Sequence, residues 1–196
     1  MKSLNGSELA AYIKQRQLHQ VRGLRQAHGI VPKLAIVVTV DNPVIDVYMR
    51  LKKAYGADIL VEVEVYRVKQ VEVEELLNRL GKDDTIQAVI VQLPLESPEE
   101  TDQIVNLVAP SKDVDALGKN AEFDPATPMA ILWLLSGYNV DLKGKRVLLI
   151  GRGKLVGAPL EKMLLASGID VRIADRQTED LKSETLEADV IITAAG

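Results

Sequence analysis

Hydrophobic positions along the first half of the chain alternate between helical and strand-like spacing. Apolar residues over 3–29 recur at near-helical intervals and predict a long amphipathic helix. The continuous run LAIVVTV at 34–40 predicts a strand buried on both faces, as in a parallel sheet. Further helices are expected over 44–55, 71–80 and 98–108, and further strands within 59–66 and over 86–93. Strands and helices that alternate at this length are typical of βαβ units.

This rhythm stops between Ala109 and Pro128, a stretch interrupted by proline and glycine. Long connections in compact chains often mark a domain boundary or carry function. The pattern then restarts with a linker helix at about 127–138, strands over 146–150, 171–174 and 189–193, and helices over 155–166 and 180–186. We therefore predict two α/β domains, 1–121 and 122–196, the first a three-layer domain with a mostly parallel sheet.

Composition and charge narrow the classes of protein. The chain has 24 basic and 28 acidic residues, so its net charge is −4, and it lacks the dense block of lysine and arginine with which proteins bind nucleic acid. The apolar runs are far shorter than the roughly 20 residues that cross a bilayer, and the polar N-terminus does not resemble a signal peptide. No cysteine is present and there are only two histidines, so we expect no metal site. We therefore expect a cytoplasmic protein that binds neither nucleic acid nor membranes.

A glycine-rich loop follows the strand at 146–150. Gly151 can make a tight turn, Gly153 leaves the backbone room to approach a pyrophosphate, and Gly157 lets the next helix pack closely. The helix N-terminus then offers free N–H groups to an anion. The spacing GxGxxxG is one residue longer than the common fingerprint, and a plain strand-to-helix turn is the alternative. The strand, loop, helix and second strand in order favour a Rossmann-like NAD(P)-binding domain.

The choice between NADP and NAD stays open at this point. Asp175 ends the second strand, where an acid commonly holds the ribose hydroxyls of NAD. Arg176 and Arg152 favour NADP, because two guanidinium groups can grip a 2′-phosphate. An Asp–Arg surface pair of little consequence is the remaining interpretation.

Several motifs together resemble those of the methylenetetrahydrofolate dehydrogenase/methenyltetrahydrofolate cyclohydrolase family, over nearly the whole chain and in the right order. The motifs are DNPxxxxYxxxK at 41–52, VQLPL at 91–95, PSKDVD at 110–115, DLKGKxVLLIGRGxxVGxP at 141–159, and ADVIITAAG at 188–196. The resemblance implies an enzyme that oxidises 5,10-methylenetetrahydrofolate with NADP or NAD. It also implies that the enzyme hydrolyses the methenyl product to 10-formyltetrahydrofolate.

The resemblance also implies roles for individual residues. The family's active-site tyrosine, lysine and glutamine fall on Tyr48, Lys52 and Gln92, and its substrate-orienting aspartate falls on Asp115. Val91 and Leu93 flank the glutamine where folate is expected to bind. The nucleotide loop falls on Gly151, Arg152 and Gly153, and Arg176 occupies the position that reads the 2′-phosphate, so NADP is the expected cofactor, with Asp175 as the reason to keep NAD open.

The chemistry of these residues is consistent with such roles. Tyr48 and Lys52 are four apart and share one helix face. A lysine becomes a useful acid or base near neutral pH only if burial or neighbours depress its pKa. Gln92 can position that amine without adding charge, and Asp115 can pair with the amino-pyrimidinone edge of a pterin. Without the resemblance, Tyr48 and Lys52 would be interpreted as an ordinary surface pair, and Asp113 and Asp115 as loop caps.

The chain also departs from the family pattern. Val40, Ile45, Ala116, Ala130 and Gly153 replace residues that are usually glycine, serine, glycine, glycine and serine. Members of the family continue beyond residue 196, so the Rossmann-like domain is expected to be incomplete, with one open sheet edge. A homodimer that covers this edge is expected; a fragment or a reduced homologue are the alternatives. A non-catalytic folate- or nucleotide-binding relative and a different two-domain dehydrogenase remain the alternative functions.

Overall fold

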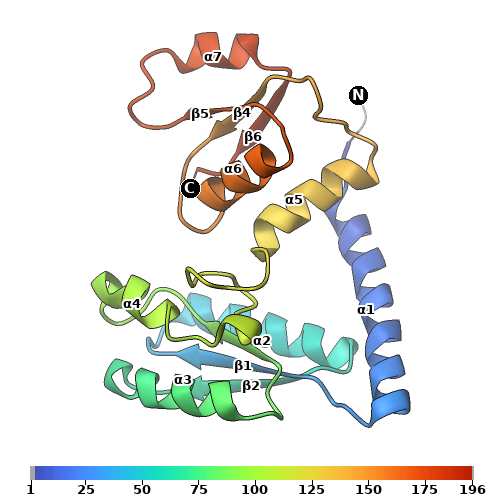
Figure 1. The fold of residues 1–196 in the computed structure, drawn as a ribbon, viewed down its shortest axis with the longest axis vertical. Helices are drawn as coiled ribbons and strands as arrows, with labels where there is room; N and C mark the ends of the chain where they lie inside the picture. The colour runs from blue at the N-terminus through green and yellow to red at the C-terminus, as the bar shows by residue number, and fades with distance from the viewer. Residues whose placement is uncertain (1–2, 196) are drawn as a thin grey trace. The chain divides into compact units, whose positions relative to one another are not determined.

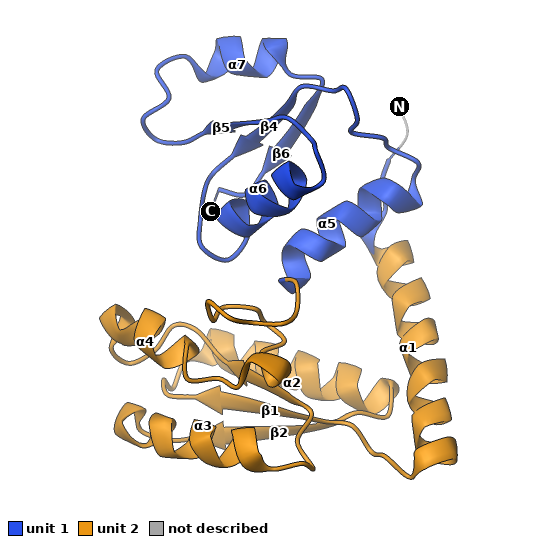
Figure 2. Cartoon of the chain, in the orientation of Figure 1, with its two compact units in different colours: residues 1–6, 125–196 blue, residues 7–124 orange. Residues whose placement is uncertain are grey.

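The computed structural model describes residues 3–195 and divides into two compact units (Figure 2). One unit is Ser7–Asp124; the other runs from Pro125 onward and includes the short stretch before Ser7. Gly196, which ends the predicted ADVIITAAG motif, lies outside the described residues.

The Ser7–Asp124 unit is built on a three-stranded parallel sheet (Figure 1). The strand order is β2-β1-β3, so β1 is central and the chain crosses it to reach β3. In such sheets, ligands bind outside the carboxyl ends of the strands where the direction of winding reverses. The elements are α1 (Gly6–His28), β1 (Lys33–Val38), α2 (Pro43–Asp58), β2 (Glu62–Arg67), α3 (Val73–Lys82), β3 (Ala88–Val91) and α4 (Thr101–Val105), with 3₁₀ turns at Gln70–Glu72, Pro98–Glu100 and Pro110–Lys112.

Alternate residues of β1 face opposite sides of this sheet. Ala35 and Val37 pack into a cluster with apolar residues of α3 and α4. Ile36 and Val38 pack into a second cluster with residues of α2. Figure 1 shows α2 and α3 on opposite sides of the strands. Because both faces are covered, the strand must be apolar throughout, and the predicted three-layer α/β fold with a parallel sheet is confirmed.

Some predicted element boundaries were wrong. The helix predicted over 98–108 is a 3₁₀ turn followed by α4, which ends at Val105 because the next residues form i→i−3 bonds, Leu107 N to Ile104 O and Val108 N to Val105 O. The first helix begins at Gly6 rather than Ser3, and β1 ends at Val38 rather than Val40.

The second unit repeats the topology with shorter elements. Its sheet is also parallel, in the order β5-β4-β6, and its core holds buried residues of β4 and α6 packed against α5. This βαβαβ arrangement is Rossmann-like, as predicted. The elements are α5 (Ala126–Gly137), β4 (Val147–Ile150), α6 (Gly157–Ala166), β5 (Val171–Ala174), α7 (Leu181–Glu187) and β6 (Val190–Thr193). In the residues described, no helix combines the length and apolar character that a bilayer crossing requires.

Candidate active site

The side chain at the centre of the candidate site is Lys52, on α2. The helix begins where the Oδ1 of Asn42 accepts a hydrogen bond from the Val44 N–H at 2.8 Å, with Pro43 as its first residue. This start sets the helical phase that directs the Lys52 ammonium to the Oε1 of Gln92, at 3.0 Å. Gln92 directly follows β3, so the pair lies at the carboxyl end of the sheet.

Gln92 is held at both its backbone and its side chain. Its backbone N–H donates to the Val37 carbonyl at 2.9 Å, which continues the sheet ladder by one residue. Its Nε2 donates to the Leu93 carbonyl, also at 2.9 Å. Because the amide nitrogen is engaged there, the amide oxygen is the atom presented to Lys52. The amine is therefore positioned by a neutral acceptor.

Burial dominates the electrostatics of the site. It lowers the pKa of Lys52 below the ordinary lysine value, and the charge of Asp115 opposes this effect. Burial likewise raises the pKa of Asp115, with Lys52 acting against the shift and Asp113 adding to it. Burial therefore favours the neutral form of both groups. For Lys52 this brings the pKa of the amine closer to the neutral pH range in which it can transfer protons.

The structure places the Lys52 ammonium against Gln92 and in electrostatic interaction with Asp115, while the other predicted substrate-binding residues have different surroundings. Tyr48 lies one turn before Lys52 on α2, with 53% of its surface exposed. Val91 is buried in the cluster under α3 and α4, and Leu93 packs against the same cluster. The predicted contacts of these three residues with folate stay predictions.

The glycine loop is shaped by close backbone contact. Gly151 has φ +96°, a conformation that glycine tolerates. A Cβ at Gly157 would lie 2.1 Å from the Gly151 carbonyl oxygen, so only glycine lets α6 begin so near the loop. The residue before the helix, Val156, provides no side-chain cap. In the first turn of α6, however, the Ala158 N–H donates to the Gly153 carbonyl at 3.0 Å, and the Leu160 N–H donates to the Val156 carbonyl at 2.9 Å. Pro159 has no N–H, so most of the N–H groups that were expected to be free for an anion are engaged or absent.

The charged residues around this loop differ in the hydrogen bonds and ion pairs that they form. Arg152 Nε donates to Glu161 Oε2 on α6 at 2.6 Å, a pairing that the sequence analysis missed. The carboxylate of Asp175 accepts from the Gln177 N–H at 2.8 Å, inside its own turn. Arg176 is exposed, and within residues 3–195 it forms no hydrogen bond or ion pair. Arg152 and Glu161 are nine positions apart in the sequence, a spacing that gave no local signal of their pairing.

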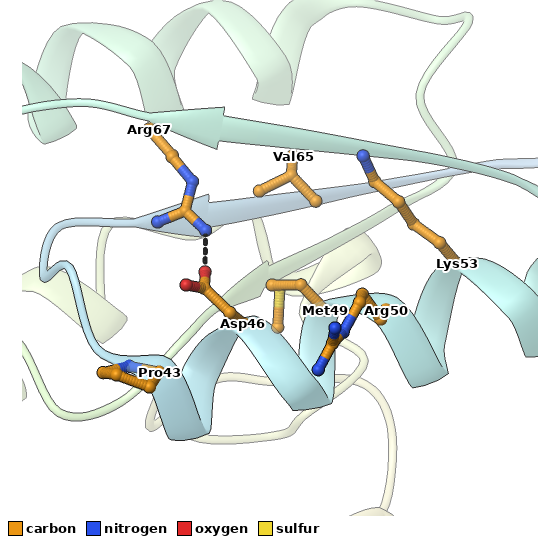
Figure 3. Close-up of a pocket in the computed structure, with 7 residues that line it drawn as sticks. All are labelled: Pro43, Asp46, Met49, Arg50, Lys53, Val65 and Arg67. Carbon is orange, nitrogen blue, oxygen red and sulfur yellow. Dashed lines mark hydrogen bonds and ion pairs between the residues drawn. The ribbon is translucent and has the colours of Figure 1, made fainter.

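A separate pocket of about 560 Å³ lies between α2 and β2 (Figure 3). Arg67 extends from β2 across it and forms an ion pair with Asp46. Arg50 and Lys53 also line this pocket. None of the predicted catalytic residues is among its lining side chains, so its size does not identify it as the reaction site.

Family models match both units. The tetrahydrofolate dehydrogenase/cyclohydrolase catalytic domain matches residues 4–115, and the corresponding NAD(P)-binding domain matches residues 125–196. The bifunctional protein FolD of Acetivibrio thermocellus is 33% identical over all of this chain and 73% of its own length. That of Campylobacter jejuni is 34% identical over all of this chain and 74% of its own.

Solved structures agree with these matches. The crystal structure of the Campylobacter jejuni bifunctional enzyme, 34% identical, superposes with a TM-score of 0.93 and covers 98% of this chain and 73% of its own. The Trypanosoma brucei enzyme, solved with NADP and an inhibitor, is 25% identical with a TM-score of 0.90, over 98% of this chain and 71% of its own. The chain belongs to the tetrahydrofolate dehydrogenase/cyclohydrolase family.

Proposed function

We propose that this protein oxidises 5,10-methylenetetrahydrofolate to the methenyl form with NADP and hydrolyses that form to 10-formyltetrahydrofolate. The observation that carries the proposal is the Lys52–Gln92 contact of 3.0 Å, in a chain whose N-terminal part matches the family's catalytic domain. We assign folate binding to residues 1–121 and cofactor binding to residues 122–196.

In the hydrolytic step, Lys52 acts as the general base. Its neutral amine, favoured by burial, takes a proton from a water molecule as the water oxygen adds to the electrophilic methenyl carbon. The proton then returns to the ring nitrogen as its bond to this carbon breaks, the added hydroxyl loses its remaining proton to solvent, and the resulting formyl group remains on the other nitrogen. Gln92 fixes the amine, and Asp115 pairs with the amino-pyrimidinone edge of the pterin.

The glycine loop and its neighbours are proposed to hold NADP. Gly151, Gly153 and Gly157 would accommodate the pyrophosphate, while Arg152 and Arg176 would bind the 2′-phosphate. The engagement of the Asp175 carboxylate by its own turn favours NADP over NAD, because one of its acceptor positions is occupied. NADP, when bound, supplies the acceptor for the hydride that leaves the methylene carbon.

We further propose that the protein acts in the cytoplasm as a homodimer. One observation supports the dimer. β6 forms its parallel ladder with β4, and of the strands in the described residues that is its one partner, so its other edge carries backbone groups with which a second chain can pair. Sedimentation equilibrium of the purified chain tests the dimer.

Enzyme assays test the proposed activities directly. Purified, folded protein should form the methenyl product with NADP faster than with NAD, and should hydrolyse added methenyltetrahydrofolate. Folate binding by calorimetry without turnover would instead indicate a non-catalytic relative. Substitutions test the choice of cofactor. Arg176→Ala should weaken NADP binding more than NAD binding. Arg172 forms an ion pair with Glu184, and the control variant Arg172→Ala should have little effect on the binding of either cofactor. Equal losses in Arg176→Ala would contradict the phosphate-reading role.

A further inference from the structure

The loop that carries Asp115 is anchored by a second carboxylate. Asp113 is only 3% exposed, and among the residues that the structure describes it is the one charged residue that is buried. Its Oδ2 accepts the N–H of Gly118 at 2.8 Å, and its backbone carbonyl accepts the N–H of Ala116 at 3.2 Å. One residue therefore closes the turn from both its side chain and its main chain, with Asp115 inside the closed segment.

The turn is tied to the rest of its unit at several points. Asp113 pairs with Val89 of β3 in an isolated parallel bridge. The ammonium of Lys112 donates to the carbonyls of Leu80 and Asp83 at 2.9 and 2.8 Å, which caps the end of α3. Asp113 thus connects the loop to the sheet, and the adjacent Lys112 connects it to a helix.

Backbone strain within the turn shows that its geometry is imposed. Ala116 has φ +53°, a conformation costly for a residue with a Cβ. Such strain persists only where surrounding contacts over-determine the chain. Gly118 is equally constrained, since a Cβ there would lie 3.0 Å from Asp113 Oδ2 and 3.1 Å from the Val105 carbonyl. Within the turn itself, Asp113 accepts the N–H groups of both Gly118 and Ala116, so its contacts directly hold the strained segment.

We propose that Asp113 is the positioning residue of the active site: its buried carboxylate holds the 113–118 turn so that Asp115 stays beside Lys52 and meets the pterin edge. This inference rests on the proposed function for its catalytic consequence. It assigns Asp113 no contact with substrate. The charged neighbours of Asp113 are Lys112, whose ammonium is engaged by α3, Asp115, and Lys119, which lines the same small cavity of about 270 Å³.

Two substitutions separate the shape of Asp113 from its charge. Asp113→Ala removes the acceptor, so Asp115 should be misplaced and the KM for methenyltetrahydrofolate should rise about tenfold or more, given how steeply rate depends on position. Asp113→Asn keeps an oxygen for the Gly118 N–H and should keep KM near wild type. Asp84→Asn, an exposed carboxylate in another loop, is the matched control and should change nothing.

The carboxyl titration of Asp115, followed by NMR with ¹³C-labelled aspartate, provides a readout that needs no turnover. In Asp113→Asn the midpoint of Asp115 should move to lower pH, because the neighbouring charge that raises its pKa is gone. An unchanged Asp115 midpoint in Asp113→Asn, or a wild-type KM in folded Asp113→Ala, would overturn the inference. If wild type itself lacks turnover, the proposed function fails, while the titration still decides the role of Asp113.

Discussion

Two lysines of the same unit show opposite electrostatic behaviour. Lys33 begins β1 and lies 3.2 Å from Glu62 and 3.3 Å from Glu64 on the neighbouring strand. These carboxylates raise its pKa. Lys52 contacts a neutral amide instead, and burial lowers its pKa. The comparison shows that a partly buried lysine becomes a candidate base when its direct partner is an uncharged acceptor.

The largest expected effect comes from removing the amine of the site. Lys52→Met should lower the rate of methenyltetrahydrofolate hydrolysis by about 10²- to 10⁴-fold, the usual contribution of a general acid or base. Lys53→Met, the adjacent exposed lysine, should remain near wild type. Stopped-flow absorbance measures both. Equal losses of rate in the two variants would show that Lys52 has no catalytic role that Lys53 lacks.

A second change gives Lys52 the kind of partner that Lys33 has. Gln92→Glu places a carboxylate against the amine and should raise the Lys52 pKa by about one to three units. Hydrolysis at neutral pH should fall about tenfold or more and recover in alkaline solution. The pH–rate profile tests this, with Gln103→Glu, on the exposed side of α4, as control. An unshifted profile would contradict the proposed role of the neutral partner.

Stability should depend on pH in opposite directions for the two lysines. The pKa of Lys33 is raised, so its stabilising contribution is present below the ordinary value of 10.5 and is lost as pH rises through the folded pKa. The pKa of Lys52 is lowered, so Lys52→Met should increase the free energy of unfolding at neutral pH. That gain should shrink as pH rises from the folded pKa towards 10.5. Urea unfolding across this range measures both.

The smallest expected effect concerns the strained turn near Lys52. Ala116→Gly relieves a positive φ and should stabilise the protein by about 0.5–1 kcal/mol, after the larger chain entropy of unfolded glycine is counted. Thermal unfolding monitored by circular dichroism would detect it. Ala130→Gly, in the interior of α5, should instead destabilise by a similar amount. A destabilised Ala116→Gly variant would show that the turn is not strained.

The local pattern predicted most of the elements, because continuous apolar strands and helix boundaries are written in neighbouring residues. The Asn42-Pro43 helix start and the βαβ alternation follow directly from such signals. α4 was predicted too long, because its 3₁₀ continuation still presents buried apolar residues such as Val108 at helix-like spacing. A hydrophobic pattern reports burial more reliably than it reports which hydrogen bonds are made.

By itself, the sequence determined the two α/β units, the glycine loop and the residue types available for chemistry. Only the tertiary structure decided what each side chain does. Lys52 and Lys53 are neighbours in sequence, yet one meets Gln92 and the other lines a pocket near Arg67. Asp113 and Asp115 are two apart, yet one anchors the turn and the other interacts with Lys52. The burial of a side chain and its contact partners are set by segments that are distant in sequence, and the pKa of an ionisable group depends on both.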